Sequence, residues 1–357
     1  MKYKNILVTG GAGFIGSNLA ISFKRKYSDL KIACLDNLKR RGSELNLARL
    51  RENDIDFIHG DIRCPEDLVL NRKTDLLLEC SAEPSVLAGY GDNPAYIINT
   101  NLTGTINCLE LCRKNKADII FLSTSRVYPY SKINGLKTIE TGTRFEWGKQ
   151  NKAISGWSAK GIDIDFTLEG PKTLYGATKL ASELILQEYI TNYGIKGVIN
   201  RCGIIAGPWQ FGKVDQGVFT LWMLAHYFKK PLKYIGFGGK GLQVRDLVHI
   251  DDLFELIEKE TVSLNKVNGN VYNVGGGRRV SLSLLETTRI CEEITGNHIR
   301  IGKDSCDRPG DIRVYLTDNK RAVQDLDWSP RKDPKQILSD IQVWINENER
   351  KLKQALF

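Results

Sequence analysis

This 357-residue sequence predicts an α/β fold, in which a doubly wound parallel sheet is joined by a smaller mixed α/β lobe. Over residues 1–200, short apolar runs alternate with helical segments, as is typical of repeated βαβ units. A glycine-rich turn directly after the first run supports this fold, because such turns join the first strand to the first helix in these sheets. Six runs fit strands of the sheet: residues 6–8, 32–35, 55–58, 76–78, 119–122 and 198–199.

The glycine-rich turn has the spacing of a dinucleotide-binding motif. Gly10, Gly13 and Gly16 recur at intervals of three residues and open a helical pattern. A side chain here would keep a pyrophosphate from the backbone, and the N-terminus of the helix attracts the negative charge of that group. The second run ends at Asp36, where a carboxylate can bind the ribose hydroxyls of NAD. We therefore predict a Rossmann domain that binds NAD. The predicted contacts are Gly10, Gly13, Phe14, Ile15, Gly16, Asp36 and Asn37.

The third strand is closed by Gly60, Asp61 and Ile62. In a sheet of this kind, the loop at this place lies beside the adenine ring. The Asp61 carboxylate can accept a hydrogen bond from the exocyclic amine of adenine, and a simple turn is the alternative.

Composition and charge are those of an ordinary globular enzyme, with 41% hydrophobic and 26% charged residues. The 51 basic and 42 acidic residues give a net charge of +9. The basic residues are dispersed, so we expect no nucleic-acid partner, and a phosphorylated substrate suits the bias equally well. The chain enters a strand at once and contains no bilayer-length apolar run, which predicts a cytoplasmic protein without membrane contact. Eight scattered cysteines predict reduced thiols and no metal site.

Two stretches depart from the βαβ rhythm. Residues 129–170 are polar and aperiodic, and a connection of this length predicts a functional loop or lid. After residue 206 the chain becomes irregular and aromatic, which predicts the start of a second lobe, with a late strand at 272–274 and helices at 282–294 and 337–352. We assign residues 1–205 and 244–272 to the NAD-binding domain, and residues 206–243 and 273–357 to the substrate lobe.

Tyr175 and Lys179 are the strongest catalytic candidates, because they lie four residues apart in a helical pattern and share one face. An ammonium group near a phenol stabilises the phenolate, which can accept a proton from an alcohol that NAD oxidises. Lys179 can also bind the nicotinamide ribose. Thr124 follows the strand at 119–122, where side chains face the ligand crevice, and it can bind the same substrate oxygen. The alternatives are an ordinary helix surface and a hydroxyl that bonds its own backbone.

Several segments together match one enzyme family. These are residues 9–16 with Asp36, Asn-Leu-Thr-Gly-Thr at 101–105, Ser-Thr-Ser-Arg-Val-Tyr at 123–128, and Tyr-Gly-Ala-Thr-Lys at 175–179. Over nearly its whole length the chain resembles the extended short-chain dehydrogenases, which are mainly nucleotide-sugar epimerases and dehydratases. At 79–84, Glu-Cys-Ser-Ala-Glu-Pro departs from the family's H-x-A-A/G pattern. The resemblance implies these further cofactor contacts: Asp61, Ile62, Ser81, Ala82, Asn101, Ser123, Tyr175 and Lys179.

Two later segments resemble the parts of this family that hold the nucleotide diphosphate. Arg245 stands in Gln-Val-Arg-Asp-Leu-Val-His at 243–249, and Arg308 opens Arg-Pro-Gly-Asp at 308–311. Arginine forks suit diphosphate oxygens, which agrees with the role that the resemblance implies. The resemblance implies this substrate set: Thr124, Arg201, Gln210, Asp215, Gln216, Gln243, Arg245 and Arg308.

The two residues after Thr124 separate the branches of the family. Dehydratases carry Asp-Glu there, whereas this chain has Ser125 and Arg126, which favours an epimerase. Residues 140–145, 165–166, 201–203 and 210–217 are most similar to the CDP-paratose (CDP-tyvelose) 2-epimerases. The resemblance implies NAD-dependent inversion at C2 of a CDP-hexose or CDP-deoxyhexose through a transient keto sugar, by a homo-oligomer (dimer or tetramer).

Two alternatives remain. A UDP-hexose 4-epimerase would use the same catalytic set at C4. A non-catalytic NAD-binding sensor or scaffold is the second alternative, and it typically lacks the catalytic Tyr or Lys. The presence of Thr124, Tyr175 and Lys179 together argues against it.

Overall fold

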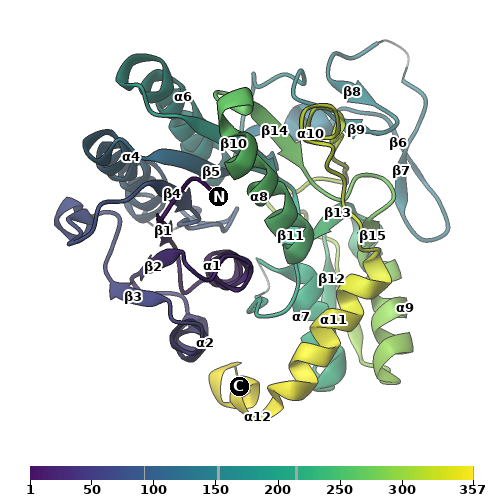
Figure 1. Cartoon of the computed structure of the whole chain (residues 1–357). Coiled ribbons are helices and arrows are strands. Elements are labelled where there is room, and N and C mark those ends of the chain that lie inside the picture. Colours follow the sequence, from purple (N-terminus) through teal and green to yellow (C-terminus); the bar gives the residue numbers. More distant parts are fainter. Residues whose placement is uncertain (92, 151–152, 214–215, 357) are drawn as a thin grey trace.

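The computed structural model describes residues 1–91, 93–150, 153–213 and 216–356. Its largest element is a parallel sheet of seven strands in the order β3-β2-β1-β4-β5-β10-β14 (Figure 1). The strands are β1 (Asn5–Thr9), β2 (Lys31–Asp36), β3 (Asp56–His59), β4 (Leu76–Glu79), β5 (Asp118–Thr124), β10 (Gly197–Cys202) and β14 (Val271–Val274). Neighbours pair in parallel throughout, which confirms the predicted doubly wound fold.

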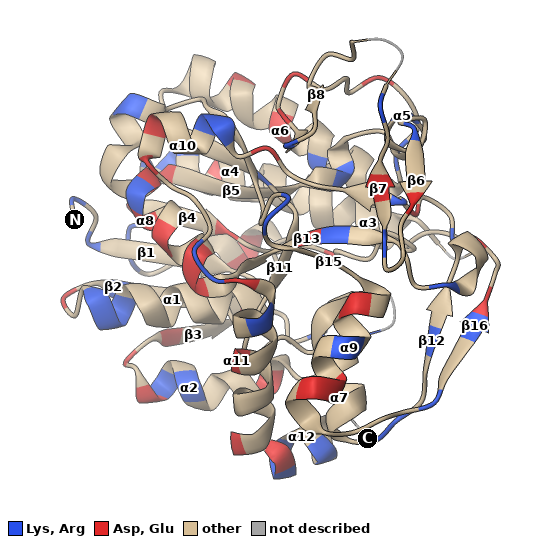
Figure 2. Cartoon of the chain, turned by 90° about the vertical axis from the view of Figure 1, so that its right-hand side faces the viewer, with Lys and Arg blue, Asp and Glu red and all other residues tan. Residues whose placement is uncertain are grey.

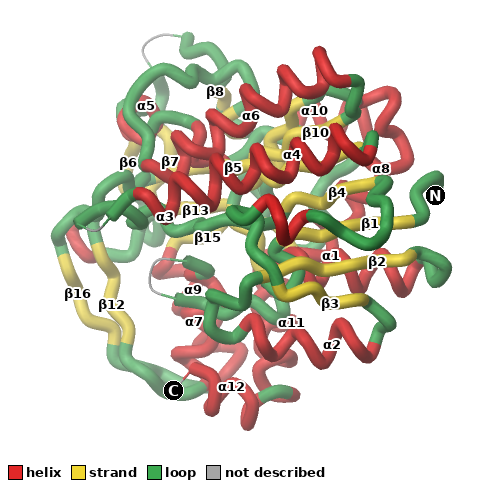
Figure 3. Tube along the Cα trace, turned by 90° about the vertical axis from the view of Figure 1, so that its left-hand side faces the viewer, coloured by secondary structure: helices red, strands yellow, loops and turns green. Residues whose placement is uncertain are grey.

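Helices cover both faces of this sheet, and Figure 3 shows its yellow strands β4, β1, β2 and β3 one above the other among the red helices. The side chains of each strand alternate between the two faces. In β1, Ile6 and Val8 pack on one side, against α1 (Phe14–Lys26), α2 (Asn46–Glu52), α8 (Ile250–Val267) and α10 (Lys320–Leu326). Leu7 packs on the other side, against α4 (Gly104–Asn115) and α6 (Leu174–Tyr193). The sheet is therefore the buried middle layer of three.

The second lobe is built on a sheet of four short strands. They are β11 (Ile204–Ala206), β13 (Val244–His249), β15 (Ser281–Ser283) and β17 (Val314–Tyr315). The helices α7 (Val218–Tyr227), α9 (Leu284–Thr295), α11 (Pro334–Glu347) and α12 (Glu349–Leu356) enclose a separate apolar core with the aromatic rings of Phe219, Trp222 and Trp344. A two-stranded sheet, β12 (Leu232–Ile235) with β16 (Ile301–Asp304), extends from this lobe (Figure 2).

Residues 129–170 contain more structure than the predicted loop or lid. They form α5 (Tyr130–Asn134), a hairpin of β6 (Thr138–Glu140) with β7 (Phe145–Trp147), and a hairpin of β8 (Trp157–Ser158) with β9 (Gly161–Ile162). Ile162 and Phe166 are buried with Tyr128, and Arg144 is paired with Glu286 of α9. These contacts hold the segment against the rest of the protein. Sequence periodicity could not predict these strands, because each has only two or three residues.

Two predicted helices have different bounds. The helix at 337–352 is two helices, α11 and α12, that meet at Asn348. The helix predicted at 282–294 is α9, which begins at Leu284 because Ser283 caps it: the Ser283 hydroxyl accepts from the Glu286 N–H at 3.0 Å. The remaining short helical turns are α3 (Ala95–Ile98), η1 (Ser43–Leu45), η2 (Pro65–Leu68), η3 (Asn99–Thr103), η4 (Ser125–Val127) and η5 (Phe237–Gly239).

The pairing of the strands can be compared with the predicted domain boundaries, but it does not test them. β13, predicted within the NAD-binding domain, pairs with the strands of the small sheet, and the helix that follows it packs on the large sheet. β14 lies in the large sheet through Val274. The division at residues 205, 243 and 272 therefore stays a prediction.

Candidate active site

A cavity of about 860 Å³ lies at the carboxyl ends of the large sheet and is lined by residues of both lobes. It takes residues from the ends of β1, β2, β4, β5 and β10, including Asp36, Cys80, Thr124 and Cys202. The order of the strands reverses between β1 and β4, and ligands of doubly wound sheets bind beside such a reversal. The second lobe closes the cavity with residues such as Gln210 and Arg245.

The glycine turn leaves no room for side chains. A Cβ on Gly16 would lie 2.3 Å from the Gly10 carbonyl oxygen. Gly10 has φ +62°, and a Cβ on it would lie 2.8 Å from the Cys80 carbonyl oxygen. Gly13 precedes α1, whose first turn has neither an acidic residue nor a side-chain cap, so its N–H groups and dipole are available to an anion. The turn therefore fits a pyrophosphate, and its predicted residues Gly10, Gly13, Phe14, Ile15 and Gly16 all line the cavity.

The acid after β2 is fixed by the backbone around it. Asp36 accepts hydrogen bonds from the N–H groups of Ala12 (3.1 Å) and Leu38 (2.8 Å), while burial raises the pKa of its carboxyl group. Asn37 donates to Asp61 at 2.8 Å. The hydrogen bond from Arg63 is the main reason why the pKa of Asp61 falls to about 2. Asp36, Asn37, Asp61 and Ile62 all line the cavity, and their role in holding an adenosine stays a prediction.

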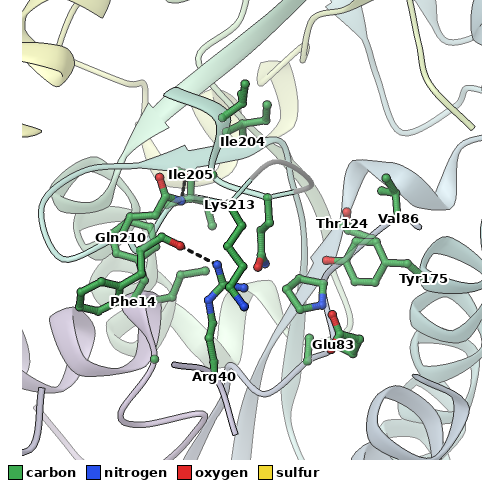
Figure 4. Close-up of a pocket in the computed structure, with 18 of the residues that line it drawn as sticks. Phe14, Arg40, Glu83, Val86, Thr124, Tyr175, Ile204, Ile205, Gln210 and Lys213 are labelled. Atoms are coloured by element: carbon green, nitrogen blue, oxygen red, sulfur yellow. Dashed lines mark hydrogen bonds between the residues drawn. The ribbon is translucent and has the colours of Figure 1, made fainter. Parts of the chain in front are cut away.

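Thr124 and Tyr175 lie next to each other in the wall of the cavity (Figure 4). Thr124 is the last residue of β5, and Tyr175 stands in the first turn of α6, which is capped by the hydroxyl of Thr173. Burial raises the pKa of the Tyr175 hydroxyl to about 12, and the neighbouring Thr124 hydroxyl opposes this change. The arrangement can hold one substrate oxygen between a hydrogen-bond donor and a proton acceptor.

Lys179 lies behind this pair and does not line the cavity. Its side chain is 1% exposed, and its Nζ lies 3.4 Å from Oε2 of Glu79, whose side chain is fully buried. The ammonium group also lies 4.0 Å from the centre of the Phe121 ring. Glu79 is the residue at which the sequence departs from the family pattern, so this departure gives Lys179 a buried carboxylate partner.

Two other predicted ligand contacts lie outside the cavity lining. Asn101 is fully buried, and its amide bonds the backbone of Glu83 in both directions, at 2.8 and 3.0 Å. Arg201 forms a buried ion pair with Glu183, Nη2 to Oε2 at 2.7 Å. Glu183 also accepts from the hydroxyl of Ser123, which does line the cavity. Asn101 therefore supports the loop at 81–84. Arg201 is engaged by Glu183 and is not among the substrate contacts of the proposed function.

The other predicted substrate residues line the second lobe's side of the cavity. Gln210 is fixed by bonds to the Ile205 carbonyl (2.8 Å) and the Thr220 hydroxyl (2.6 Å). Arg245 is paired with Asp311. The remaining predicted residues that line the cavity are Ser81, Ala82, Ser123, Thr124, Gln210, Gln216, Gln243, Arg245 and Arg308. The predicted Asp215 lies outside the described residues.

The predicted cofactor and substrate contacts do not include several cations that line the cavity. Arg40 and Lys213 project into it from opposite lobes (Figure 4), and Arg40 donates to the Phe211 carbonyl at 2.6 Å. Arg126 lines the wall next to Thr124 and Tyr175. In the sequence, Arg40 belongs to a basic run that follows Asp36. Arg126 stands where the dehydratases have an acid.

Within the described ranges, no helix is both long and apolar enough to cross a membrane. The same residues bring together no group of three His, Cys, Asp or Glu side chains that could hold a metal ion.

Comparisons with known proteins agree with this geometry. The model of the NAD dependent epimerase/dehydratase family matches residues 6–275. The chain is 30% identical to the CDP-paratose 2-epimerase of Salmonella typhi over 353 residues, which cover 96% of this chain and 99% of the relative. It is also 30% identical to a putative UDP-glucose 4-epimerase of Methanocaldococcus jannaschii over 97% of this chain and 99% of the relative.

Among solved structures, the chain is similar to UDP-glucuronic acid 4-epimerase from Bacillus cereus in complex with UDP-glucuronic acid and NAD. The TM-score is 0.78 and the identity 26%, over 96% of this chain and 99% of that one. The predicted family and the predicted NAD cofactor are confirmed. Because the family model matches well over half of the chain, the chain belongs to the NAD dependent epimerase/dehydratase family and is an NAD-using enzyme of the extended short-chain dehydrogenase type.

Proposed function

We propose that this protein inverts C2 of a CDP-hexose or CDP-deoxyhexose through a transient 2-keto sugar. The observation that supports an alcohol–ketone chemistry is that the hydroxyl-bearing side chains of Thr124 and Tyr175 lie next to each other in the wall of the cavity. Ser125 and Arg126 follow Thr124, so no carboxylic acid stands next to it to eliminate water. The choice of C2 and of a CDP-sugar rests on the relative from Salmonella typhi, which matches nearly the full length of both chains.

The residues of this chain have separate tasks in the proposed reaction. Thr124 donates a hydrogen bond to the reacting oxygen, and Tyr175 takes the proton of the hydroxyl group and later returns it. Bound NAD supplies the hydride acceptor and donor. Gly10, Gly13 and Gly16 hold its pyrophosphate, and Asp36 binds the adenosine ribose.

Arg245 and Arg308 anchor the diphosphate of the substrate. Both line the cavity on the second lobe's side, away from the glycine turn. A sugar that must present its two faces in turn needs an anchor on the part of the substrate that does not react. Arginine forks provide it, because two N–H groups can bind two phosphate oxygens at once.

A UDP-hexose 4-epimerase is the second candidate. The relative from Methanocaldococcus jannaschii and the Bacillus cereus structure favour it, since both are 4-epimerases by name and both match the chain over nearly its full length. The same Thr–Tyr pair would then act on the C4 hydroxyl. Assembly into a homo-oligomer stays a prediction for either function.

Turnover in D₂O of matched CDP- and UDP-sugars tests the proposal. We expect epimerisation of CDP-paratose or a related CDP-sugar at C2, and no turnover of UDP-glucose. The inverted carbon should carry no deuterium, because its hydrogen never becomes a solvent-exchangeable proton. Turnover of UDP-glucose alone would replace the proposal by the second candidate. Deuterium at the inverted carbon after one turnover, C2 for the CDP-sugar or C4 for UDP-glucose, would reject the alcohol–ketone route for that substrate.

A further inference from the structure

Residues 208–211 of the second lobe are in contact with the lobe that carries the glycine turn. This segment follows β11 and contributes Gln210 and Phe211 to the lining of the cavity. Phe14 and Arg40 line the same cavity from the other lobe, and Phe14 begins α1 directly after the glycine turn. The two lobes therefore meet beside the turn that fits the pyrophosphate of NAD.

Asn18 of α1 and Arg49 of α2 hold this segment from outside the cavity. The Asn18 amide donates to the Pro208 carbonyl at 3.1 Å and to the Phe14 carbonyl at 2.9 Å. The Arg49 guanidinium lies 4.1 Å from the centre of the Trp209 ring and donates to Oδ1 of Asn18 at 2.8 Å. Asn18, Arg49 and Trp209 do not line the cavity, so these contacts join the lobes without touching a ligand inside it.

The loop after β2 holds the other end of the segment. Arg40 Nη2 donates to the Phe211 carbonyl at 2.6 Å (Figure 4). A Cβ on Gly42, where φ is +98°, would lie 2.7 Å from the Phe211 ring. The Phe211 ring also packs against Trp344 of α11, with 5.9 Å between the ring centres. Phe211 is thus held by the loop of one lobe and by the apolar core of the other.

The backbone of the segment depends on these contacts. Trp209 has φ +71°, which lies in the left-handed region that a bulky side chain rarely adopts. Such a conformation persists only where its surroundings determine it. Here the Trp209 ring contacts Arg49 on one lobe and Trp344 on the other, with 5.8 Å between the two tryptophan rings. Loss of the Arg49 contact should therefore let the segment move.

We propose that residues 208–211 form a clasp that closes the cavity over bound NAD, and that Asn18 and Arg49 hold the clasp shut from outside. NAD then enters or leaves only when these contacts break. An epimerase that takes a hydride from its sugar and returns it must keep its cofactor in the meantime, which gives the clasp a use. That use rests on the proposed function, whereas the clasp itself requires only that NAD is the cofactor.

The test is the rate at which the NAD-loaded protein releases its cofactor. Protein that holds radiolabelled NAD is mixed with excess unlabelled NAD, and the label that stays bound is followed in time. The variants are Arg49→Met, Trp209→Leu and the double variant, which remove the same contact from opposite lobes. Arg25→Met is the control, because Arg25 joins α1 to Asn53 at the end of α2 within one lobe, with 3.1 Å between Nε and Oδ1.

We expect each single variant to release NAD about 2- to 30-fold faster than the wild type, which is the factor that one cation–π contact provides. The double variant should be no faster than the faster single variant, because both changes remove one shared contact. Arg49→Lys should recover part of the slow release, and Arg25→Met should behave as the wild type. An unchanged rate in either single variant, or a double variant with the product of both effects, would overturn the proposal. Arg49→Gln replaces Arg49→Met if the latter does not fold.

Equilibrium dialysis of the same NAD-loaded proteins separates a clasp from a direct contact with the cofactor. A clasp slows entry and release alike, so in both single variants the affinity for NAD should change much less than the release rate. A fall in affinity as large as the rise in the release rate would mean that entry is unchanged, and would reject the proposal. Neither measurement needs a sugar, so a failure of the proposed epimerase activity would leave these results in place.

Discussion

Arg245 and Asp311 form an ion pair in the wall of the cavity, with Nη2 2.6 Å from Oδ1. Arg245 also donates to the Val244 carbonyl at 2.8 Å. Burial lowers the pKa of its guanidinium to about 10, and Asp311 opposes this change. The two bonds hold the fork in one orientation in the cavity wall, so little side-chain freedom is lost when it binds a phosphate.

Arg245→Ala should weaken substrate binding and leave NAD bound. A charge-assisted hydrogen bond contributes roughly 1.5–3 kcal/mol, so KM should rise about 10- to 100-fold. Arg245→Lys should recover part of this, because an ammonium group keeps the charge but not the fork. Steady-state kinetics and the NAD content of the purified protein measure both effects. If Arg245→Ala instead loses its NAD, Arg245 serves the cofactor and not the substrate.

The protein should bind NAD more tightly than NADP. The Asp36 carboxylate is held by the N–H groups of Ala12 and Leu38 beside the cavity, where it would repel a 2′-phosphate. Arg40 works against this preference, but it bonds the Phe211 carbonyl across the cavity. Asp36→Ala should reduce the ratio of NAD affinity to NADP affinity. Calorimetric titration measures the affinity of the protein for each cofactor. Tighter binding of NADP than of NAD by the wild-type protein would contradict the assignment.

Local patterns were enough to predict the large sheet and its ligand turn. Strand residues alternate between the two helical layers, and turns bound each apolar run. Residues that are close in the sequence therefore indicate both the type of each element and the order of the elements. The glycine spacing is equally local, because Gly16 meets the carbonyl of Gly10 six residues earlier. The fold class and the NAD cofactor could therefore be predicted from the sequence alone.

Pairings between distant segments could not be predicted in this way. Glu79 and Lys179 are 100 residues apart in the sequence, and only the folded chain brings the end of β4 beside this residue of α6. The family resemblance implied that Arg201 contacts the substrate, but Glu183 of α6 lies against β10 and pairs with Arg201. The breaking of the last helix at Asn348 likewise depends on packing and not on periodicity.

Gly16→Ala should reduce NAD binding and stability together. Its Cβ would lie 2.3 Å from a backbone oxygen, so the turn must shift, at a cost of about 1–3 kcal/mol. Gly142→Ala is the matched control, because its Cβ would meet nothing within 4 Å. Urea unfolding and cofactor affinity measure the two effects. Equal behaviour of both variants would show that the turn tolerates a side chain.

Stability should fall as the pH rises from about 5 to 8, because of Glu260. This side chain is fully buried in α8, accepts from Asn200 at 2.9 Å, and has its pKa raised by burial to about 8. The unfolded value is about 4.3, so between the two values the folded protein binds more protons than the unfolded chain. Stability therefore decreases with pH across this window.

Glu260→Gln should remove this decrease, since an amide keeps the shape and does not ionise. The gain at pH 8 should be on the order of a few kcal/mol, and near pH 4 it should vanish. Urea unfolding at several pH values measures it, with the exposed Glu347→Gln as control. The same pH slope in wild type and Glu260→Gln would show that another group is responsible.

Tyr175→Phe should abolish epimerisation while the fold and bound NAD persist. The change removes one hydroxyl group from the start of α6, beside Thr124 in the cavity wall. General acid–base catalysis typically contributes 10²–10⁴-fold, so kcat should fall by about that factor with a small change in KM.

Tyr96→Phe removes a hydroxyl from another tyrosine that lines the cavity and serves as the control. Its kcat should stay near the wild-type value, because the Tyr96 ring is stacked with Lys39. A Tyr175→Phe protein that retains more than about a tenth of the wild-type kcat would mean that another group takes the proton, and the assignment of Tyr175 would then be wrong.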